Sequence, residues 1–251
     1  MIYFVGAGSG APDLITVRGA RLIARADVIV YAGSLVNPEL LAGRKEGCEV
    51  YDSAKMTLEE VLAVMIPAAR AGKTVVRLHT GDPCVYGAHR EQMDALDVEG
   101  IPYEVCPGVS SFCGAAAALK AEYTLPGVSQ TVILTRMEGR TPVPGRERIE
   151  ALAAHGASMV IFLSAGRLGE LSQRLTQGGY PPDTPAAIVY KATWPEEKVV
   201  RTTVSGLADA ARREGITKTA LITVGGFLGG GYERSKLYDP SFTTGYREAS
   251  E

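Results

Sequence analysis

The chain has 251 residues, of which 46% are apolar and 22% are charged, and its formal net charge is −2. This length and apolar content can form one large or two ordinary hydrophobic cores, as in a globular protein. The near balance of charge, without a Lys/Arg run, argues against nucleic acid or anionic lipid as a partner.

Targeting and metal-binding signals are absent from the sequence. No apolar stretch reaches the roughly 20 residues that cross a bilayer, and the N-terminus lacks the features of a secretion signal. We therefore expect a cytoplasmic protein that does not bind membranes. The four cysteines form no C-x-x-C pair and the three histidines are far apart, so we expect reduced thiols and no metal site.

Short β-rich runs alternate with helical patterns in the first half of the chain. Strands separated by helices indicate an α/β fold with a mainly parallel sheet. The pattern predicts strands over 2–5, 28–32, 74–80 and 102–106, and helices over 16–26, 58–71, 87–99 and 111–121.

The pattern breaks at TLPGV, residues 124–128, and then begins again. Two successive strand patterns joined through TWPEE predict a β-hairpin, so the second sheet should be mixed. We expect two α/β domains, 1–122 and 123–251, with a ligand cleft between them. The second half predicts strands over 131–137, 158–164, 186–192, 198–204 and 220–226, and helices over 146–154, up to about 177, and over 206–213.

The first glycine loop formally fits a dinucleotide-binding fingerprint, with Gly6-x-Gly8-x-x-Ala11 after the first strand. A true fingerprint needs a carboxylate at the tip of the second strand, and none follows residues 28–32. The first credible helix cap is Thr16, well past the glycines. We therefore interpret the match as false, and glycines that only permit a tight turn remain an alternative.

Two further loops follow predicted parallel strands, where open α/β sheets place their ligands. In the loop over 81–87, Gly81 allows close approach to the backbone and Asp82 offers a carboxylate, although an Asp there can also cap the following helix. The loop over 107–111 leads into a helix with a small-residue face at 114–118. That face suits a flat ligand or, more commonly, a packed neighbour.

Together, GAGSGAPDLIT, HTGDPCVYG and PGVSS resemble the signature loops of the tetrapyrrole methylases. The similarity extends through SLVNPELL, TVILTRMEGRTPVP, VYKATWPEEKVVRTT and SKLYDPSFTTGYR. These later segments are similar to the family branch that methylates carbon 11 of precorrin-4 or cobalt-precorrin-4 in cobalamin biosynthesis. The resemblance implies a homodimeric enzyme that transfers a methyl group from S-adenosyl-L-methionine and releases S-adenosyl-L-homocysteine.

The resemblance also implies a set of cofactor-binding residues. Many relatives read Gly-Pro-Gly-Asp where this chain has Gly8-Ser9-Gly10-Ala11, so the carboxylate of that loop is missing here. Apolar and backbone contacts should recognise the adenine. By resemblance, the cofactor contacts are Ser9, Gly81, Asp82, Pro83, Val85, Tyr86, Ser110, Ser111, Leu163, Ala192 and Ala220.

The implied substrate is a tetrapyrrole that carries carboxylates, which basic side chains can bind. Glu138 is the candidate for accepting a proton from the ring, and an ion pair with Arg136 or Arg140 is its alternative role. No nucleophile is required, because the sulfonium donor is already activated. The candidate substrate contacts are Lys55, Arg136, Arg140, Lys191, Trp194 and Arg201, each of which an ordinary solvated or structural role also explains.

Three other functions remain open from the sequence. One is a sibling methylase that acts on another ring carbon or, in the diphthamide branch, on a protein. The second is a nicotinamide-dependent oxidoreductase, and the third is a tetrapyrrole-binding protein without catalysis.

Overall fold

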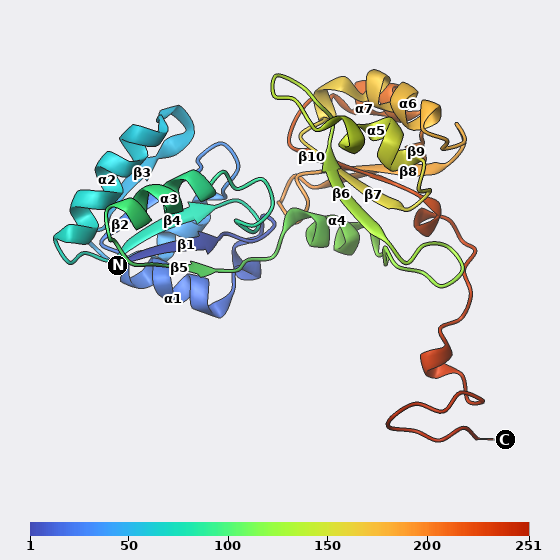
Figure 1. The fold of residues 1–251 in the computed structure, drawn as a ribbon, viewed down its shortest axis with the longest axis horizontal. Coiled ribbons are helices and arrows are strands. Elements are labelled where there is room, and N and C mark those ends of the chain that lie inside the picture. The colour runs from blue at the N-terminus through green and yellow to red at the C-terminus, as the bar shows by residue number, and fades with distance from the viewer. Residues whose placement is uncertain (251) are drawn as a thin grey trace. The chain divides into compact units, whose positions relative to one another are not determined.

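The computed structural model describes residues 1–250, which form two compact units (Figure 1). The first unit contains Met1–Ala115 together with Lys191–Glu197. The second contains Ala116–Tyr190 and the residues from Lys198 on. The domain limits expected from the sequence, 1–122 and 123–251, stay a prediction.

The first unit is built on a five-stranded parallel sheet of order β3-β2-β4-β1-β5. The edge strand β3 was not expected from the sequence, because three of its four residues are exposed and it lacks a buried apolar run. The strands are β1 Ile2–Gly6, β2 Val28–Tyr31, β3 Glu49–Asp52, β4 Val75–His79 and β5 Tyr103–Cys106.

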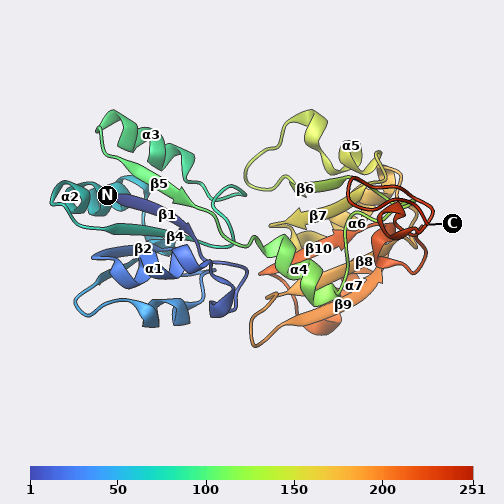
Figure 2. The ribbon, with the colours of Figure 1, turned by 90° about the horizontal axis from the view of Figure 1, so that it is seen from below.

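Helices cover both faces of this sheet, with α1 on one face and α2 and α3 on the other (Figures 1 and 2). Alternate residues of β1 point to opposite faces, so Val5 packs with α1 and Phe4 with α2 and α3. Thr16 caps α1 as expected, and Thr57 forms a capping box at α2. The helices that begin in this unit are α1 Val17–Arg25, α2 Leu58–Arg70, α3 Arg90–Val98 and α4 Ser111–Leu119.

Helix α3 begins three residues later than the sequence pattern predicted. Tyr86 and Ala88 both have left-handed backbone angles, with φ of 55° and 46°. A right-handed helix cannot include such residues, so the chain turns there before α3 begins at Arg90.

The second unit has a mixed sheet of order β6-β7-β10-β8-β9, which confirms the prediction. Strands β8 and β9 form the expected antiparallel hairpin, and only β6 and β7 run parallel. Its strands are β6 Val132–Arg136, β7 Ser158–Phe162, β8 Pro185–Tyr190, β9 Lys198–Thr203 and β10 Ala220–Val224.

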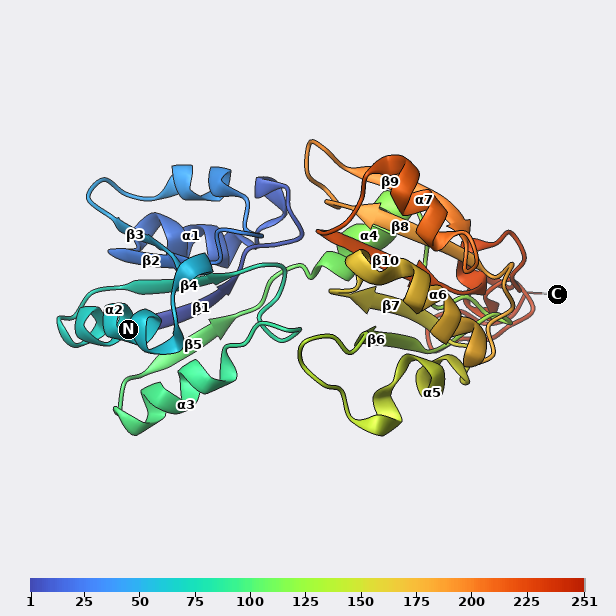
Figure 3. The same cartoon turned by 90° about the horizontal axis from the view of Figure 1, so that it is seen from above.

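Three helices lie together on one face of this second sheet and bury its core (Figure 3). They are α5 Ile149–Ala153, α6 Leu168–Gln177 and α7 Leu207–Glu214. Helix α5 is shorter than predicted, because Arg148 is extended and separates it from a 3₁₀ turn at Gly145–Glu147. Within residues 1–250, no helix has both the length and the apolar content to span a membrane.

Candidate functional site

Three loops of the first unit meet at the carboxyl ends of parallel strands. Residues 7–13 follow β1, residues 80–88 follow β4, and residues 107–110 follow β5. These strands are neighbours in the sheet, so their loops emerge side by side, in the usual ligand-binding position of an open α/β sheet. We call them the strand-end loops.

Glycines bring the backbones of the strand-end loops into direct contact. Gly8 and Gly81 exchange two backbone hydrogen bonds, with N···O distances of 3.2 and 3.0 Å. A Cβ atom at Gly6 would lie 2.6 Å from Gly108 Cα, and one at Gly108 would overlap the Gly81 carbonyl oxygen. The first loop's glycines therefore pack against the protein itself, rather than forming a pyrophosphate cradle.

A carboxylate does lie beside the tip of β2, but it comes from β3. Asp52 Oδ1 accepts hydrogen bonds from the backbone N–H groups of Gly33 at 3.0 Å and Ala54 at 2.9 Å. Sequence spacing missed it because β3 was not expected. With these two bonds, Asp52 stabilises the loops that follow β2 and β3.

Asp82 joins two of the strand-end loops. Its two carboxylate oxygens accept hydrogen bonds from the backbone N–H groups of Cys84 at 2.8 Å and Gly108 at 2.7 Å. Partial burial opposes ionisation, but these hydrogen bonds outweigh it and hold the pKa of Asp82 below its usual value. Asp82 is thus an ionised side chain that links the two loops. This role is close to the alternative given from the sequence, in which Asp82 caps backbone N–H groups.

Thr80, just before Gly81, carries a buried hydroxyl oxygen without a hydrogen-bond partner in the described residues. Such orphaned groups are rare in folded proteins and call for a specific explanation. Gly81 has a φ of +62°, and its Cα hydrogen faces Ser110 and Ser111. The Thr80 hydroxyl and the backbone of Ser110 and Ser111 therefore surround this point, a neutral polar set that fits the polar end of a small ligand.

Ser9 and Gly114 explain the small-residue face of α4. Ser9 is 6% exposed, and a Cβ atom at Gly114 would lie 2.7 Å from Ser9 Cβ. At this position the small-residue face packs against Ser9 of the protein itself, which is the commoner of the two explanations given from the sequence. The Ser9 hydroxyl is 3.2 Å from the Thr193 hydroxyl and forms a hydrogen bond with it.

The loop of the β8–β9 hairpin, residues 191–197, belongs to the first unit by its contacts. Thr193 Oγ1 accepts a hydrogen bond from the Ala11 N–H at 3.0 Å, and the Trp194 ring lies against Gly10. Lys191 Nζ lies 5.0 Å from the centre of the Trp194 ring. Thr193 was missed from the sequence, because its partners are more than 180 residues away along the chain.

Two of the expected cofactor residues lie at the same end of two neighbouring strands, β7 and β10, of the second sheet. Leu163 follows β7, is 71% exposed and has a φ of 52°. Ala220 begins the antiparallel strand β10 and pairs with Tyr190 at the end of β8. The structure therefore places an exposed apolar side chain, that of Leu163, at the strand end where Ala220 also lies.

Left-handed backbone angles outside glycine are concentrated in these segments. Such residues are strained and tend to gather at functional sites, where the surrounding structure holds them. Among the described residues, Lys120 is the one case that lies outside the expected cofactor segments or their immediate neighbours. The others are Tyr86, Ala88, Leu163, Lys191, Thr193 and Thr219.

Two of the basic residues expected to bind substrate hold the protein's own backbone instead. Arg136 donates hydrogen bonds to the carbonyls of Thr141 at 3.2 Å and Pro142 at 2.8 Å. Arg201 donates to the carbonyl of Leu119 at 2.7 Å. Lys55 and Arg140 are exposed.

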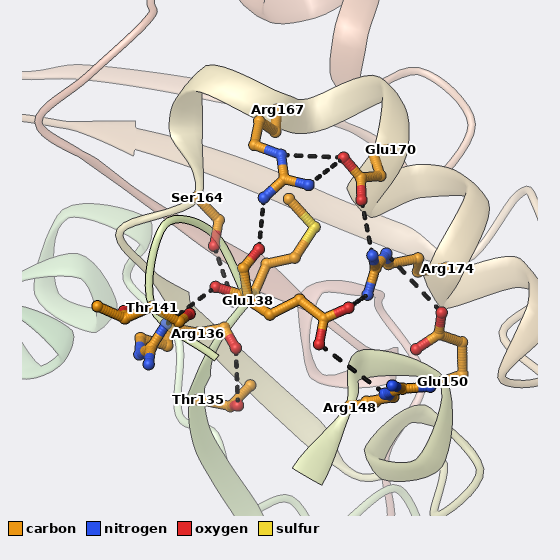
Figure 4. A network of polar contacts seen from close by, with 11 residues as sticks. Thr135, Arg136, Glu138, Thr141, Arg148, Glu150, Ser164, Arg167, Glu170 and Arg174 are labelled. Atoms are coloured by element: carbon orange, nitrogen blue, oxygen red, sulfur yellow. Dashed lines mark hydrogen bonds and ion pairs between the residues drawn. The ribbon is translucent and has the colours of Figure 1, made fainter. Parts of the chain in front are cut away.

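Glu138 is part of an ion-pair network in the second unit (Figure 4). Its carboxylate accepts a hydrogen bond from Arg174 at 2.7 Å and lies 3.8 Å from Arg148. The bond from Arg174 holds the pKa of Glu138 below its usual value. Its ion-pair partners are therefore not Arg136 or Arg140, and this environment weakens Glu138 as a base.

The described residues lack the side-chain groupings that metal and redox sites require. No group of three or more His, Cys, Asp or Glu side chains in residues 1–250 has an arrangement that could hold a metal ion. All four cysteines are free.

The family model of the tetrapyrrole (corrin/porphyrin) methylases matches residues 1–208. A cobalt-precorrin-4 C(11)-methyltransferase from Methanocaldococcus jannaschii is 52% identical over 249 residues, which is 99% of this chain and 96% of the relative. A precorrin-4 C(11)-methyltransferase from Mycobacterium tuberculosis is 46% identical over 94% of this chain and 95% of its own.

Solved structures agree with these sequence matches. An X-ray structure of a cobalt-precorrin-4 methyltransferase aligns with a TM-score of 0.89 and 51% identity, over 91% of this chain and 96% of its own. A uroporphyrin-III C-methyltransferase from Thermus thermophilus, in complex with S-adenosylhomocysteine, aligns with a TM-score of 0.74 and 28% identity. The alignment covers 90% of this chain and 92% of that chain.

Proposed function

The chain belongs to the tetrapyrrole methylases, and we propose that it transfers a methyl group from S-adenosyl-L-methionine to carbon 11 of precorrin-4 or cobalt-precorrin-4 in cobalamin biosynthesis. The observation that carries this proposal is the 52% identity to a cobalt-precorrin-4 C(11)-methyltransferase along 99% of the chain. The strand-end loops support it, because they carry the motifs that resemble the signature loops of the family.

The cofactor would be held mainly by neutral groups in the first unit. The Thr80 hydroxyl lacks a partner within residues 1–250, and Ser110 and Ser111 lie beside Gly81. Asp82 would act indirectly, because both of its oxygens are bound to backbone amides and fix the shape of the two loops. Leu163, Ala192 and Ala220 remain the proposed adenosyl contacts.

S-adenosyl-L-methionine, when bound, supplies an activated methyl group, so the residues need only position the two reacting carbons and exclude water. Orientation of this kind is worth roughly 7–11 kcal/mol in model reactions. The left-handed angles of Tyr86 and Ala88 indicate that the surrounding structure holds the 80–88 loop in a defined conformation, which favours such positioning. Glu138 remains a proposed proton acceptor, although Arg174 lowers its basicity.

The proposed substrate contacts differ in how available they are to a ligand. Lys55 and Arg140 are exposed and available to carboxylates, whereas Arg136 and Arg201 would have to leave backbone carbonyls to bind them. Lys191 and Trp194 lie together in the loop of the β8–β9 hairpin and would present a cation, now paired with Glu196, and an aromatic face to a macrocycle.

The assembly and location follow from the family resemblance. The protein would be a cytoplasmic homodimer, with a mass in analytical ultracentrifugation of twice the 26.6 kDa of one chain. A single-chain mass at micromolar concentration would contradict the dimer.

The reaction itself is tested with ¹³C-methyl-labelled S-adenosyl-L-methionine and either precorrin-4 or cobalt-precorrin-4. NMR of the product should show the label at carbon 11, and the faster substrate decides between the cobalt and cobalt-free routes. Label at another carbon would identify a sibling methylase. Binding of the macrocycle without methyl transfer would identify a binding protein.

Cofactor binding at Thr80 is tested with a matched pair of variants. Thr80 and Thr223 both carry buried hydroxyls that have no partner in the part of the chain that the structure describes, but Thr223 lies within β10 in the second unit. Since one hydrogen bond contributes about 0.5–1.5 kcal/mol, Thr80→Val should weaken S-adenosylhomocysteine binding by roughly 2- to 13-fold in calorimetry. Thr223→Val should leave it unchanged, and equal effects of the two variants would remove Thr80 from the site.

A further inference from the structure

Arg77 on β4 is a buried cation without an anionic partner. It is 7% exposed, and its Nε donates a hydrogen bond to the Gln92 Oε1 at 3.1 Å. Its Nη1 donates to the carbonyls of Val30 at 3.3 Å and Leu78 at 3.4 Å. All these acceptors are neutral, and Arg77 takes part in no ion pair with any residue from 1 to 250.

The charge nevertheless persists at neutral pH. Burial lowers the pKa of Arg77 to about 10, which still leaves the guanidinium protonated. Buried charges in folded proteins are almost always paired, because removing a charge from water is costly. The site therefore has an uncompensated positive charge.

A cavity of about 150 Å³ adjoins this guanidinium. Its walls include Thr57 at the start of α2 and the small side chain of Ala88, whose left-handed backbone shapes the loop above it. Arg77 Nη2 makes no hydrogen bond with the described part of the chain. The Thr57 hydroxyl oxygen accepts from the Glu60 N–H, and its proton is shared with the Glu59 carboxylate, so Thr57 is already engaged within the chain.

The other charged side chain in the cavity wall is Glu91, which is exposed on the first turn of α3. The nearby carboxylate of Glu60 is already bound to the Thr57 N–H at 2.7 Å. A carboxylate that enters the cavity would thus meet one buried cation and one opposing charge in the wall, Glu91, while Glu59 and Glu60 are held on Thr57 beside it.

We propose that this cavity is a subsite for a single carboxylate group. Arg77 Nη2 would bind that carboxylate, which would give the buried guanidinium an anionic partner. A volume of about 150 Å³ exceeds the roughly 30 Å³ share of one water and suits a group of the size of acetate. The carboxylate belongs either to the acidic tetrapyrrole, in which case the inference rests on the proposed function, or to a small free acid.

Gln92→Glu is the decisive variant. The side chain keeps its size and already accepts a hydrogen bond from Arg77, so the new carboxylate becomes an internal partner for the guanidinium. It gives up the bond from Gln92 Nε2 to the Ala88 carbonyl, so circular dichroism and a melting curve must confirm the fold. Glu91→Gln is the matched control, because it removes the opposing charge from the same cavity.

Acetate is titrated into the full chain while the Arg77 Nε–H resonance is followed by NMR, with acetamide as its neutral counterpart. We expect a saturable shift with acetate and none with acetamide. Binding should weaken by at least about tenfold in Gln92→Glu and tighten a few-fold in Glu91→Gln. The absence of a saturable shift, or unchanged affinity in Gln92→Glu, would overturn the proposal.

Competition distinguishes the two sources of the carboxylate. If acetate competes with the tetrapyrrole but not with S-adenosyl-L-methionine, and Gln92→Glu raises KM for the tetrapyrrole alone, the carboxylate is the substrate's. If acetate binds without competing, the ligand is a small free acid. The acetate titration requires no turnover, so failure of the proposed methyl transfer would be seen separately.

Discussion

Gly108 shows how a single residue determines the geometry of the strand-end loops. Its lack of a Cβ atom lets the backbones of Gly6, Gly81 and Gly108 touch, which no larger residue permits. The same contact explains why Gly6-x-Gly8 mimics a dinucleotide fingerprint without being one. The spacing reflects packing between loops, and the next helix starts only at Val17.

Gly108→Ala should destabilise the protein by about 1–3 kcal/mol, because the new methyl group overlaps the Gly81 carbonyl oxygen. Gly145→Ala is the control, since a Cβ atom there meets nothing within 4 Å. Urea unfolding measures both free energies. Equal stability of the two variants would show that the loops are not packed through Gly108.

His79 should make the stability of the protein sensitive to acid. It is 3% exposed, and burial lowers its pKa to about 3. Because the folded pKa lies below the unfolded value of about 6.5, only the unfolded chain binds a proton between these values. The stabilisation is therefore complete above pH 6.5 and is lost progressively as the pH falls toward 3.

Between pH 7 and pH 5 this linkage amounts to about 2 kcal/mol of unfolding free energy. His79→Leu should reduce the loss of stability over that interval by about this amount. Chemical denaturation at both pH values measures it. An unchanged difference between the two pH values would mean that His79 titrates normally in the folded protein.

Among the elements, the β8–β9 hairpin has two separate roles. Its strands are part of the second sheet, whereas its loop at 191–197 packs on residues 9–11 of the first unit. Turn chemistry in TWPEE predicted the hairpin, but it carried no information on where the loop would pack. The contacts of Thr193 and Trp194 decide that.

Trp194→Ala should lower the unfolding free energy by about 1–2 kcal/mol, because a half-buried aromatic ring is removed from Gly10. Tyr246→Ala is the aromatic control, since Tyr246 is fully exposed and its loss should change little. Denaturation followed by circular dichroism compares them. Similar small effects would indicate that the loop does not pack stably on residues 9–11.

At the scale of the whole molecule, a ligand that binds only the folded chain should stabilise it. At a concentration of 100 times Kd the gain is about 2.7 kcal/mol, which corresponds to roughly 5–11 °C for a chain of this size. S-adenosylhomocysteine should therefore raise the melting temperature, and NADH should not. A shift with NADH alone would favour the oxidoreductase.

The sequence by itself determined the alternation of strands and helices, the parallel first sheet, the mixed second sheet and the order of the strand-end loops. These depend on periodicity and turn chemistry, which act between residues close along the chain. Only the tertiary structure decided that Asp82 clasps two loops, that Thr193 binds Ser9, and that Arg77 is buried among neutral groups. Such partners are chosen by the path of the folded chain, because hydrogen bonds and charges act over a few ångströms regardless of sequence separation.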